Sequence, residues 1–356
     1  MALQGSGQIS ASQIANEFGY TNGSETRLGS YRTTNGQGNF PVSFGALQFN
    51  SIDAQSGGSV PTSGQIKFSD FYGTRLQQVV NFYGSGRGGI RLIAKDRYNS
   101  GGSNDVNVVG NYRTRPNNSS GTKVHIHVNQ QIGSEKTRVE HCALRTGSWD
   151  SSTTLQVDVG GSGRIAGAGG DGGRGSNSSN GNSTFGRGGD GTSGLGVQYN
   201  PTTVNVASGG AITAGFGGGG GGGGAYDTDK EGSRTASGGG GGGGAGIPAG
   251  AGGAAGFNAG VNGGPGSAGS ASEGGTGGNN ANNDGEAVSG RGGDGGEASN
   301  PADAGNQGNG GEGSTYSPGP AGSPGAAIRR NSGFTVNVNI ASSGTVSGVQ
   351  NATTVL

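Results

Sequence analysis

The chain has 356 residues, of which 88 are glycine and 10 are proline, while only 28% are hydrophobic and 6% are aromatic. Such a chain cannot build one large side-chain core. We therefore expect several small cores and an assembly held mainly by backbone hydrogen bonds, which argues against an ordinary enzyme domain. The formal net charge is zero, and neither half of the chain has the excess of basic residues that binding to nucleic-acid phosphates needs.

Cys142 is the only cysteine, so the chain cannot form an intramolecular disulfide and a small secreted disulfide scaffold is excluded. Residues 1–5 lack the basic segment followed by an apolar stretch that is typical of an export signal, and no apolar run reaches transmembrane length. We expect a protein made in the cytoplasm without a recognisable export signal.

The first unit expected from the sequence spans residues 1–75. Ser10, followed three positions later by Gln13, has the pattern of a capped helix start, and Gly19 is a plausible helix end. These features predict a two-turn helix over residues 10–18. The aromatic residues indicate a compact docking element, and its candidate contact residues are Phe68, Phe71 and Tyr72.

Most of the strand signal lies in a second unit, residues 76–159. Short segments of alternating polarity are separated there by Gly, Asn and Ser clusters, a pattern that predicts a small antiparallel β-sandwich. The expected strands span residues 77–83, 89–94, 106–109, 123–128, 137–144 and 154–159.

A third unit, residues 160–332, consists of glycine tracts separated by short polar segments. Such tracts cannot form a stable α-helix or a side-chain-packed strand. They can adopt the polyproline II conformation, in which every backbone N–H and C=O faces outward, and a bundle of such helices satisfies the backbone laterally. Strict collagen periodicity occurs only locally, at residues 319–325. About ten tracts are expected, at residues 167–175, 186–191, 215–224, 238–246, 250–256, 260–266, 274–278, 290–296, 305–313 and 319–325.

An internal repeat links these units to the C-terminal residues 333–356. Three strand-like segments each end on an aliphatic residue that is followed, six positions later, by another aliphatic residue. This recurrence predicts stacked strands that flank the glycine bundle. The three pairs are Val159 with Ile165, Val206 with Ile212, and Ile340 with Val346. The sequence thus predicts an all-β fold with a non-regular glycine-rich region, ending in a C-terminal strand segment that packs on the bundle.

The junction at residues 165–173, where strands run into the first of many glycine tracts, resembles the glycine-rich receptor-recognising adhesins at the fibre tips of some T-even-type bacteriophages. This resemblance implies a polyglycine II sandwich whose loops meet the bacterial receptor, and a place in the virion tail after synthesis in the host cytoplasm. Residues 66–73 also resemble the start of tail proteins in phages of aquatic bacteria. The implied partners are other phage tail or fibre proteins and a bacterial surface polysaccharide or outer-membrane protein, in a chain that could form a homotrimer.

The polar segments between tracts are the candidate recognition surface, because isolated aromatics and amides suit sugars or exposed protein loops. The alternative interpretation is a set of solvated turns chosen only for flexibility. The candidate receptor-binding residues are Tyr199, Tyr226, Asp227, Asp229, Phe257, Asn280, Asn283 and Tyr316.

His125 and His127 lie on the same face of an expected strand and are the residues that a metal site would use. The simpler interpretation is a pair of exposed or hydrogen-bonded histidines, so we expect neither a metal nor a cofactor. In two glycine tracts an arginine is followed three residues later by an aspartate. At three residues per turn this spacing predicts a local ion pair rather than an RNA-binding segment, as for Arg187 with Asp190 and Arg291 with Asp294.

No nucleophile–base–acid set or glycosidase carboxylate pair stands out, so we expect a non-enzymatic protein. The leading hypothesis is a tail-fibre or tail-tip adhesin that attaches to the host surface. The alternative is a structural baseplate, neck or fibre-connecting protein without receptor contact. An ice-binding protein would need a flat face of regular small residues, which is not evident.

Overall fold

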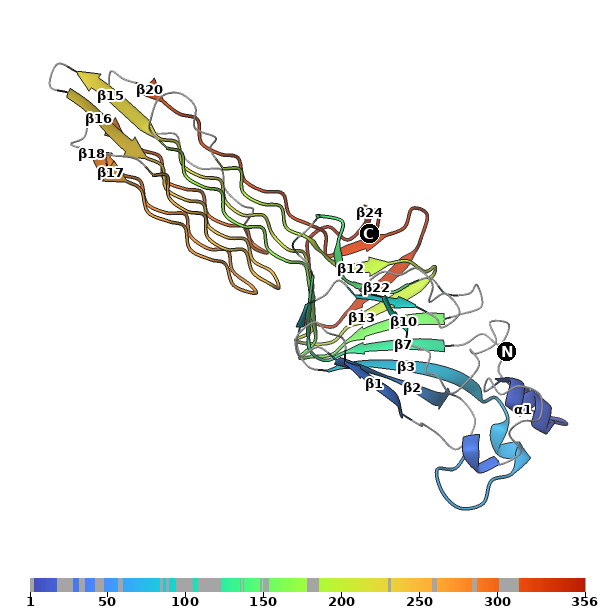
Figure 1. Ribbon diagram of the computed structural model, residues 1–356. Coiled ribbons are helices and arrows are strands. Elements are labelled where there is room, and N and C mark those ends of the chain that lie inside the picture. The colour runs from blue at the N-terminus through green and yellow to red at the C-terminus, as the bar shows by residue number, and fades with distance from the viewer. Residues whose placement is uncertain are drawn as a thin grey trace.

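The computed structural model shows a chain built mostly of strands with very little helix (Figure 1). Among the residues that it describes, no helix is both long and apolar enough to cross a bilayer. The described residues are 3–17, 28–31, 36–41, 48–56, 60–83, 86–87, 90–93, 105–107, 123–134, 136, 138–147, 149, 154–177, 186–229, 232–257, 261–283, 287–300 and 314–355.

The N-terminal helix α1 spans Ala11–Glu17 and begins as the sequence predicts. The Ser10 amide donates to Gln13 Oε1 at 2.7 Å, and the Gln13 amide donates to Ser10 Oγ at 3.2 Å. This reciprocal pair satisfies two amides that the first helical turn leaves without partners. The proposed helix end at Gly19 lies outside the described residues.

A small core holds the N-terminal segments together. Two short 3₁₀ helices, η1 (Leu28–Tyr31) and η2 (Phe68–Phe71), pack with α1 around the buried side chains of Leu3, Ile14, Tyr31 and Phe71. The rings of Tyr31 and Phe71 meet edge to face with centroids 5.8 Å apart. The Leu3 amide donates to the Thr74 carbonyl at 2.9 Å, so this core joins both ends of the first unit.

Three larger sheets form the body of the molecule, and we call them sheets A, B and C. Sheet A contains β1 (Gly36–Pro41), β2 (Gln48–Ser56), β3 (Arg75–Tyr83), β7 (Lys123–Val128), β10 (Thr154–Val159), β13 (Thr202–Val206) and β22 (Val336–Ile340). Sheet B contains β4 (Gly86–Arg87), β8 (Gln131–Gly133), β11 (Arg164–Ala166), β14 (Ala211–Thr213) and β23 (Thr345–Ser347). Sheet C contains β6 (Asp105–Asn107), β5 (Ile90–Ile93), β9 (Cys142–Arg145), β12 (Ser193–Val197), β21 (Ile328–Arg330) and β24 (Ala352–Thr353).

From β3 onward the chain passes through sheets A, B and C in turn and then repeats this circuit, with β6 as one additional strand at the edge of sheet C beside β5. This arrangement makes the body a parallel β-solenoid. One circuit is a rung, and the described strands give five rungs: β3–β4–β5, β7–β8–β9, β10–β11–β12, β13–β14–β21 and β22–β23–β24. Equivalent residues of successive rungs are paired in register, so side chains stack along the solenoid as in other repeat folds.

The stacked aliphatic residues fill the interior of the solenoid. In sheet A, Ile126 pairs with Val157, which pairs with Val204. All three are fully buried, and each buried side chain of this kind contributes roughly 1.5–3 kcal/mol of hydrophobic free energy. The predicted six-residue spacing corresponds to the step from sheet A to sheet B within a rung. Its second members are stacked in sheet B, where Ile165 pairs with Ile212, which pairs with Val346.

The predicted antiparallel sandwich in residues 76–159 is wrong. From β3 onward the strands of sheet A pair in parallel, and β10 pairs with β13 from the glycine-rich unit. Antiparallel pairs in these three sheets are described for β1 with β2 and β2 with β3. Alternating polarity fixes which face of a strand is buried but carries no information on strand direction, so the same pattern fits a solenoid rung.

Two long excursions of glycine tracts leave the solenoid between sheets B and C, one after β11 and one after β14. Figure 1 shows them as an extension that points away from the sheets, with α1 at the opposite end of the molecule. The described tract residues have neither helix nor strand assignments over most of their length. The expected tract at residues 305–313 lies outside the described residues.

Hydrogen bonds in this extension run between tracts, as expected. Residues 238–246 form the central tract, and every third amide along it donates to the same neighbour. Gly238, Gly241 and Gly244 donate to Ser176, Gly173 and Gly170 at 2.8–2.9 Å; Gly239, Gly242 and Ala245 donate to Gly290, Gly293 and Gly296 at 2.9–3.1 Å; and Gly240, Gly243 and Gly246 donate to Gly264, Ser267 and Ser270 at 3.0–3.1 Å.

The carbonyls of the central tract accept hydrogen bonds from three other tracts. The donors include the amides of Gly219, Gly253 and Gly275, at 2.7–2.8 Å. Neighbouring backbone therefore surrounds the tract and satisfies its polar groups without side chains. A Cβ added at Gly242 would lie 1.9 Å from the Gly275 carbonyl oxygen, and one at Gly241 would lie 2.0 Å from that of Gly219. Consecutive glycines are required because neighbours approach from every side.

We predict that Gly242→Ala lowers the free energy of unfolding by about 1–3 kcal/mol, since the added methyl group must push apart two tracts whose spacing is set by hydrogen bonds. Ala254→Ser, at an exposed position of an adjacent tract, is the control and should change stability by less than about 0.5 kcal/mol. Equilibrium denaturation measures both variants. Equal stability of the two would mean that the tracts are not closely packed.

Cys142 provides a second test, because its side chain is 1% exposed inside the solenoid. Burial raises the pKa of this thiol to about 12, and the thiolate is the reactive form. We predict that a thiol reagent at pH 8 labels the folded chain at least about a hundredfold more slowly than the guanidinium-unfolded chain. Comparable labelling rates would contradict the closed core.

Candidate functional site

The far end of the glycine extension carries its own small sheets. Tracts leave the solenoid, turn and return, so alternate turns lie near the body and far from it. Near turns contact the solenoid: the Ser134 amide donates to Ile247 O at 3.0 Å and Arg164 Nη2 to Ala271 O at 2.6 Å. The far turns form a four-stranded sheet and a two-stranded sheet, composed of β15 (Ala225–Asp229), β16 (Gly232–Ser237), β17 (Val261–Asn262) and β20 (Ser314–Thr315), and of β18 (Asn282–Asn283) and β19 (Ala287–Val288).

We call this far region the distal end, and Figure 1 shows its strands gathered there. Beneath the strands lies a small core made only of alanine side chains. Alanine is the smallest side chain that can be buried there, so the strands can keep the close spacing of the tracts. The members of this core are Ala225, Ala236, Ala281 and Ala287.

Several predicted recognition residues come together at the distal end. Tyr226, in β15, is half-buried and its Oη lies 3.4 Å from Ser233 Oγ. Asn283, in β18, donates to the Thr235 carbonyl at 3.4 Å, which links the two small sheets. Tyr316 follows β20, and its amide donates to the Gly224 carbonyl at 3.1 Å. The side chains of Tyr226, Asn283 and Tyr316 are each partly exposed.

Phe257 is the most exposed of the large hydrophobic residues in the described chain, at 72% of its surface. Its amide donates to Asn177 Oδ1 at 2.8 Å, so an asparagine from another tract fixes the backbone at this turn. Asn280 is also exposed. Val261, which sequence reasoning missed, is 42% exposed at the start of the next tract. Its position just after a short polar segment is the feature of the sequence that could have indicated its exposure.

Two predicted recognition residues are buried and are corrections. Tyr199 is 5% exposed and belongs to the solenoid core, far from the distal turns, where its carbonyl accepts from Thr202 Oγ1 at 2.8 Å. Asp227 is 3% exposed, and its Oδ1 has no hydrogen-bond partner. In β15 alternate side chains face opposite sides, so Asp227 points opposite to its neighbour Tyr226. Asp229 lies at the end of β15.

The three predicted docking residues of the N-terminal unit differ in their exposure to solvent. Phe71 is fully buried in the small core, so its role is structural. Tyr72 is half-buried and its hydroxyl donates to the Gly7 carbonyl. Phe68 is 42% exposed. Of the three, Phe68 offers the largest exposed apolar surface.

Local ion pairs form within two of the glycine tracts. Arg187 Nη2 lies 2.6 Å from Asp190 Oδ1, and Arg291 Nη2 lies 2.7 Å from Asp294 Oδ1, so both predicted local pairs are confirmed. The hydrogen bond from Arg187 holds the pKa of Asp190 below its usual range. Such exposed pairs contribute little to stability.

A cleft of about 420 Å³ lies between the solenoid and the first tracts, lined by Lys136, Arg138, Glu140, Asp171 and Asp190 among others. Lys136 Nζ donates to Asp171 Oδ1 at 2.6 Å. Burial alone would raise the pKa of Asp171, but the hydrogen bonds from Lys136 and from the Ala251 amide outweigh it, and the pKa is lowered. Acidic and basic side chains therefore compensate each other inside the cleft.

Comparison with known families gives one match. A family model described as "Phage tail fibre adhesin Gp38" matches residues 93–351, which run from the end of β5 to just before β24 and include all the glycine tracts and the distal end. Comparisons with curated proteins and with solved structures gave no match.

Proposed function

The chain belongs to the phage tail fibre adhesin Gp38 family, and from this premise we propose that it attaches the virion to the host-cell surface through its distal end. Membership places the chain among tail-fibre adhesins, which belong to the virion tail and associate with tail proteins and host receptors. The observation that carries the proposal is the separation of the distal end from the solenoid by tracts fixed through backbone hydrogen bonds.

The conformation proposed for the tracts is polyglycine II, with φ near about −75° and ψ near about +145°. The central tract supports this conformation, because every third amide donates to the same neighbouring tract. A polyglycine II helix has three residues per turn and would give this repeat. Its rise of about 3.1 Å per residue makes a ten-residue tract such as 167–176 roughly 30 Å long. The tracts then act as a rigid spacer, and the sequence of the distal turns can change without unfolding them.

Recognition is proposed to rest on exposed aromatic and amide side chains of the distal end. Phe257 and Tyr226 offer apolar faces, and Asn280 and Asn283 offer directional hydrogen bonds. Such pairs suit a bacterial surface polysaccharide or the exposed loops of an outer-membrane protein. Because these side chains project from a hydrogen-bonded frame, little conformational entropy is lost on binding. This mode of action requires no catalysis, and we propose a non-enzymatic adhesin.

Residues 1–75 are proposed to join the chain to other tail or fibre proteins, as one copy or as a homotrimer. The support is the position of this unit at the opposite end of the molecule from the distal turns (Figure 1) and the exposed ring of Phe68 beside its core. The alternative function, a connector without receptor contact, predicts that the distal end is covered by other virion proteins.

We predict that Phe257→Ser reduces adsorption of particles to host cells by roughly tenfold or more, as expected when a central aromatic contact is truncated. Its melting temperature should stay within about 2 °C of that of the unmodified protein, since an exposed side chain contributes little to stability. The matched control is Val349→Ser, which removes another exposed apolar side chain, 57% exposed, near the solenoid. Unchanged adsorption of the Phe257 variant would favour the connector.

We predict that Phe68→Asp folds but is incorporated into particles at a level reduced by about tenfold or more, because it places a charge in an apolar interface. Quantifying the protein in purified particles measures this effect. The Phe257 variant serves as the control, since it should be incorporated normally. Normal incorporation of the Phe68 variant would place the virion contact elsewhere on the chain.

A further inference from the structure

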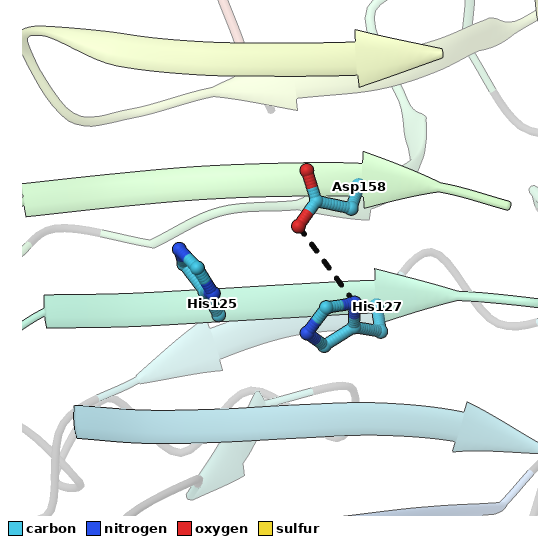
Figure 2. A group of neighbouring side chains, drawn as sticks. All are labelled: His125, His127 and Asp158. Carbon is cyan, nitrogen blue, oxygen red and sulfur yellow. Dashed lines mark ion pairs between the residues drawn. The ribbon is translucent and has the colours of Figure 1, made fainter. Parts of the chain in front are cut away.

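The outer face of sheet A carries two neighbouring histidines, His125 and His127 on β7. Val124, Ile126 and Val128 fill the solenoid core, so the two imidazoles, which alternate with them, face outward and are partly exposed. Asp158, on the adjacent strand β10, is paired in register with His127. Figure 2 shows its carboxylate directed toward His127 across the gap between the two strands.

The three side chains bring possible metal ligands close together. One ligand atom from each of His125, His127 and Asp158 lies within 4.8 Å of the others. His127 Nδ1 is 3.7 Å from Asp158 Oδ2, and the two imidazole rings are 5.7 Å apart at an angle of 85°. Zinc ligands lie about 2.0–2.2 Å from the ion, so the ligand atoms of a tetrahedral site are roughly 3.4 Å from each other. Small side-chain rotations close this difference.

A network of amides fixes the carboxylate from behind. Asp158 Oδ1 accepts hydrogen bonds from Gln156 Nε2 and from Asn205 Nδ2, both at 2.7 Å. Asn205 is oriented in turn by Asn339, whose Nδ2 donates to Asn205 Oδ1 at 2.8 Å. These bonds occupy Oδ1, and Oδ2 is the oxygen directed at His127. Ligands of metal sites are commonly held in this way by neighbouring hydrogen bonds.

The same network sets the tautomer of His125. Because the amide nitrogen of Gln156 donates to Asp158, its Oε1 faces His125 Nε2 at 3.1 Å and accepts from it. The ring proton is then on Nε2, which leaves the lone pair on Nδ1. A histidine that binds a metal through one nitrogen usually donates its other N–H to an oxygen, as His125 does here.

We propose that His125, His127 and Asp158 form a binding site for one divalent transition-metal ion, such as Zn²⁺. Two imidazoles and one carboxylate suit zinc, nickel or iron, whereas calcium and magnesium prefer sites made of oxygen ligands. The ion would join β7 to β10, two strands of successive rungs, and would stabilise the folded chain increasingly as the free zinc concentration rises above the Kd.

The site is open on one side. A groove of about 500 Å³ begins at His127 and Asp158 and continues along sheet A past Asn205, Asn339 and Ile340. Three protein ligands leave at least one position of a tetrahedral ion for another ligand. Water or a donor group from a partner protein could take this position from the groove.

Zinc binding to the full-length, chelator-treated protein tests the proposal. Calorimetric titration should give one Zn²⁺ per chain, and His127→Gln and Asp158→Asn should each weaken binding by about tenfold or more. Asn in place of Asp158 keeps an oxygen that accepts from Gln156 and Asn205, so this variant should fold even if the histidine variant does not. The matched control is His141→Gln, which changes the third of the three histidines in the chain and should bind zinc normally.

Cobalt gives an independent signal, since Co²⁺ in a four-coordinate protein site absorbs visible light much more strongly than hydrated Co²⁺ does. The unmodified protein and the His141 variant should show this absorption, and the Asp158 variant should lose it. The proposal is overturned if the unmodified protein binds no zinc, or if the Asp158 variant binds zinc and cobalt as well as the unmodified protein does.

Discussion

The backbone groups of the glycine tracts must pair with one another, because the tracts have almost no side chains to pack. A polypeptide with few apolar residues must still satisfy its buried N–H and C=O groups. The central tract at residues 238–246 does so by bonding to surrounding tracts, and a Cβ at Gly241 or Gly242 would strike their carbonyls. The tracts must therefore be nearly free of side chains, and chemically distinctive residues are displaced to the turns.

The solenoid anchors both ends of each excursion of glycine tracts. Its core of stacked valine, leucine and isoleucine residues is continuous from β7 to β21, although long glycine excursions interrupt two rungs. β11 and β12 are separated by one excursion, and β14 and β21 by the other, yet each of these strands pairs in parallel with strands of other rungs. The side-chain core fixes the start and end of the bundle, and backbone bonds fix its interior.

The sequence predicted those parts that depend on local chemistry. The Ser10–Gln13 cap, the two Arg–Asp pairs and the six-residue spacing from Val159 to Ile165 all correspond to observed features. Strand direction was missed because alternation does not encode it. Tyr199 is buried because it lies between β12 and β13 of the solenoid, and a polar segment there does not differ in sequence from one at the distal end. Asp158 was missed beside His127 because only the pairing of β7 with β10 brings them together.

Amide hydrogen exchange along residues 238–246 tests most directly whether backbone bonds between tracts hold the glycine region. These amides are all bonded to neighbouring tracts and should exchange as slowly as those of the solenoid strand β10, through global unfolding. Exchange of the central glycines within seconds, at the rate of an unstructured chain, would mean that backbone bonds between tracts do not hold the glycine region.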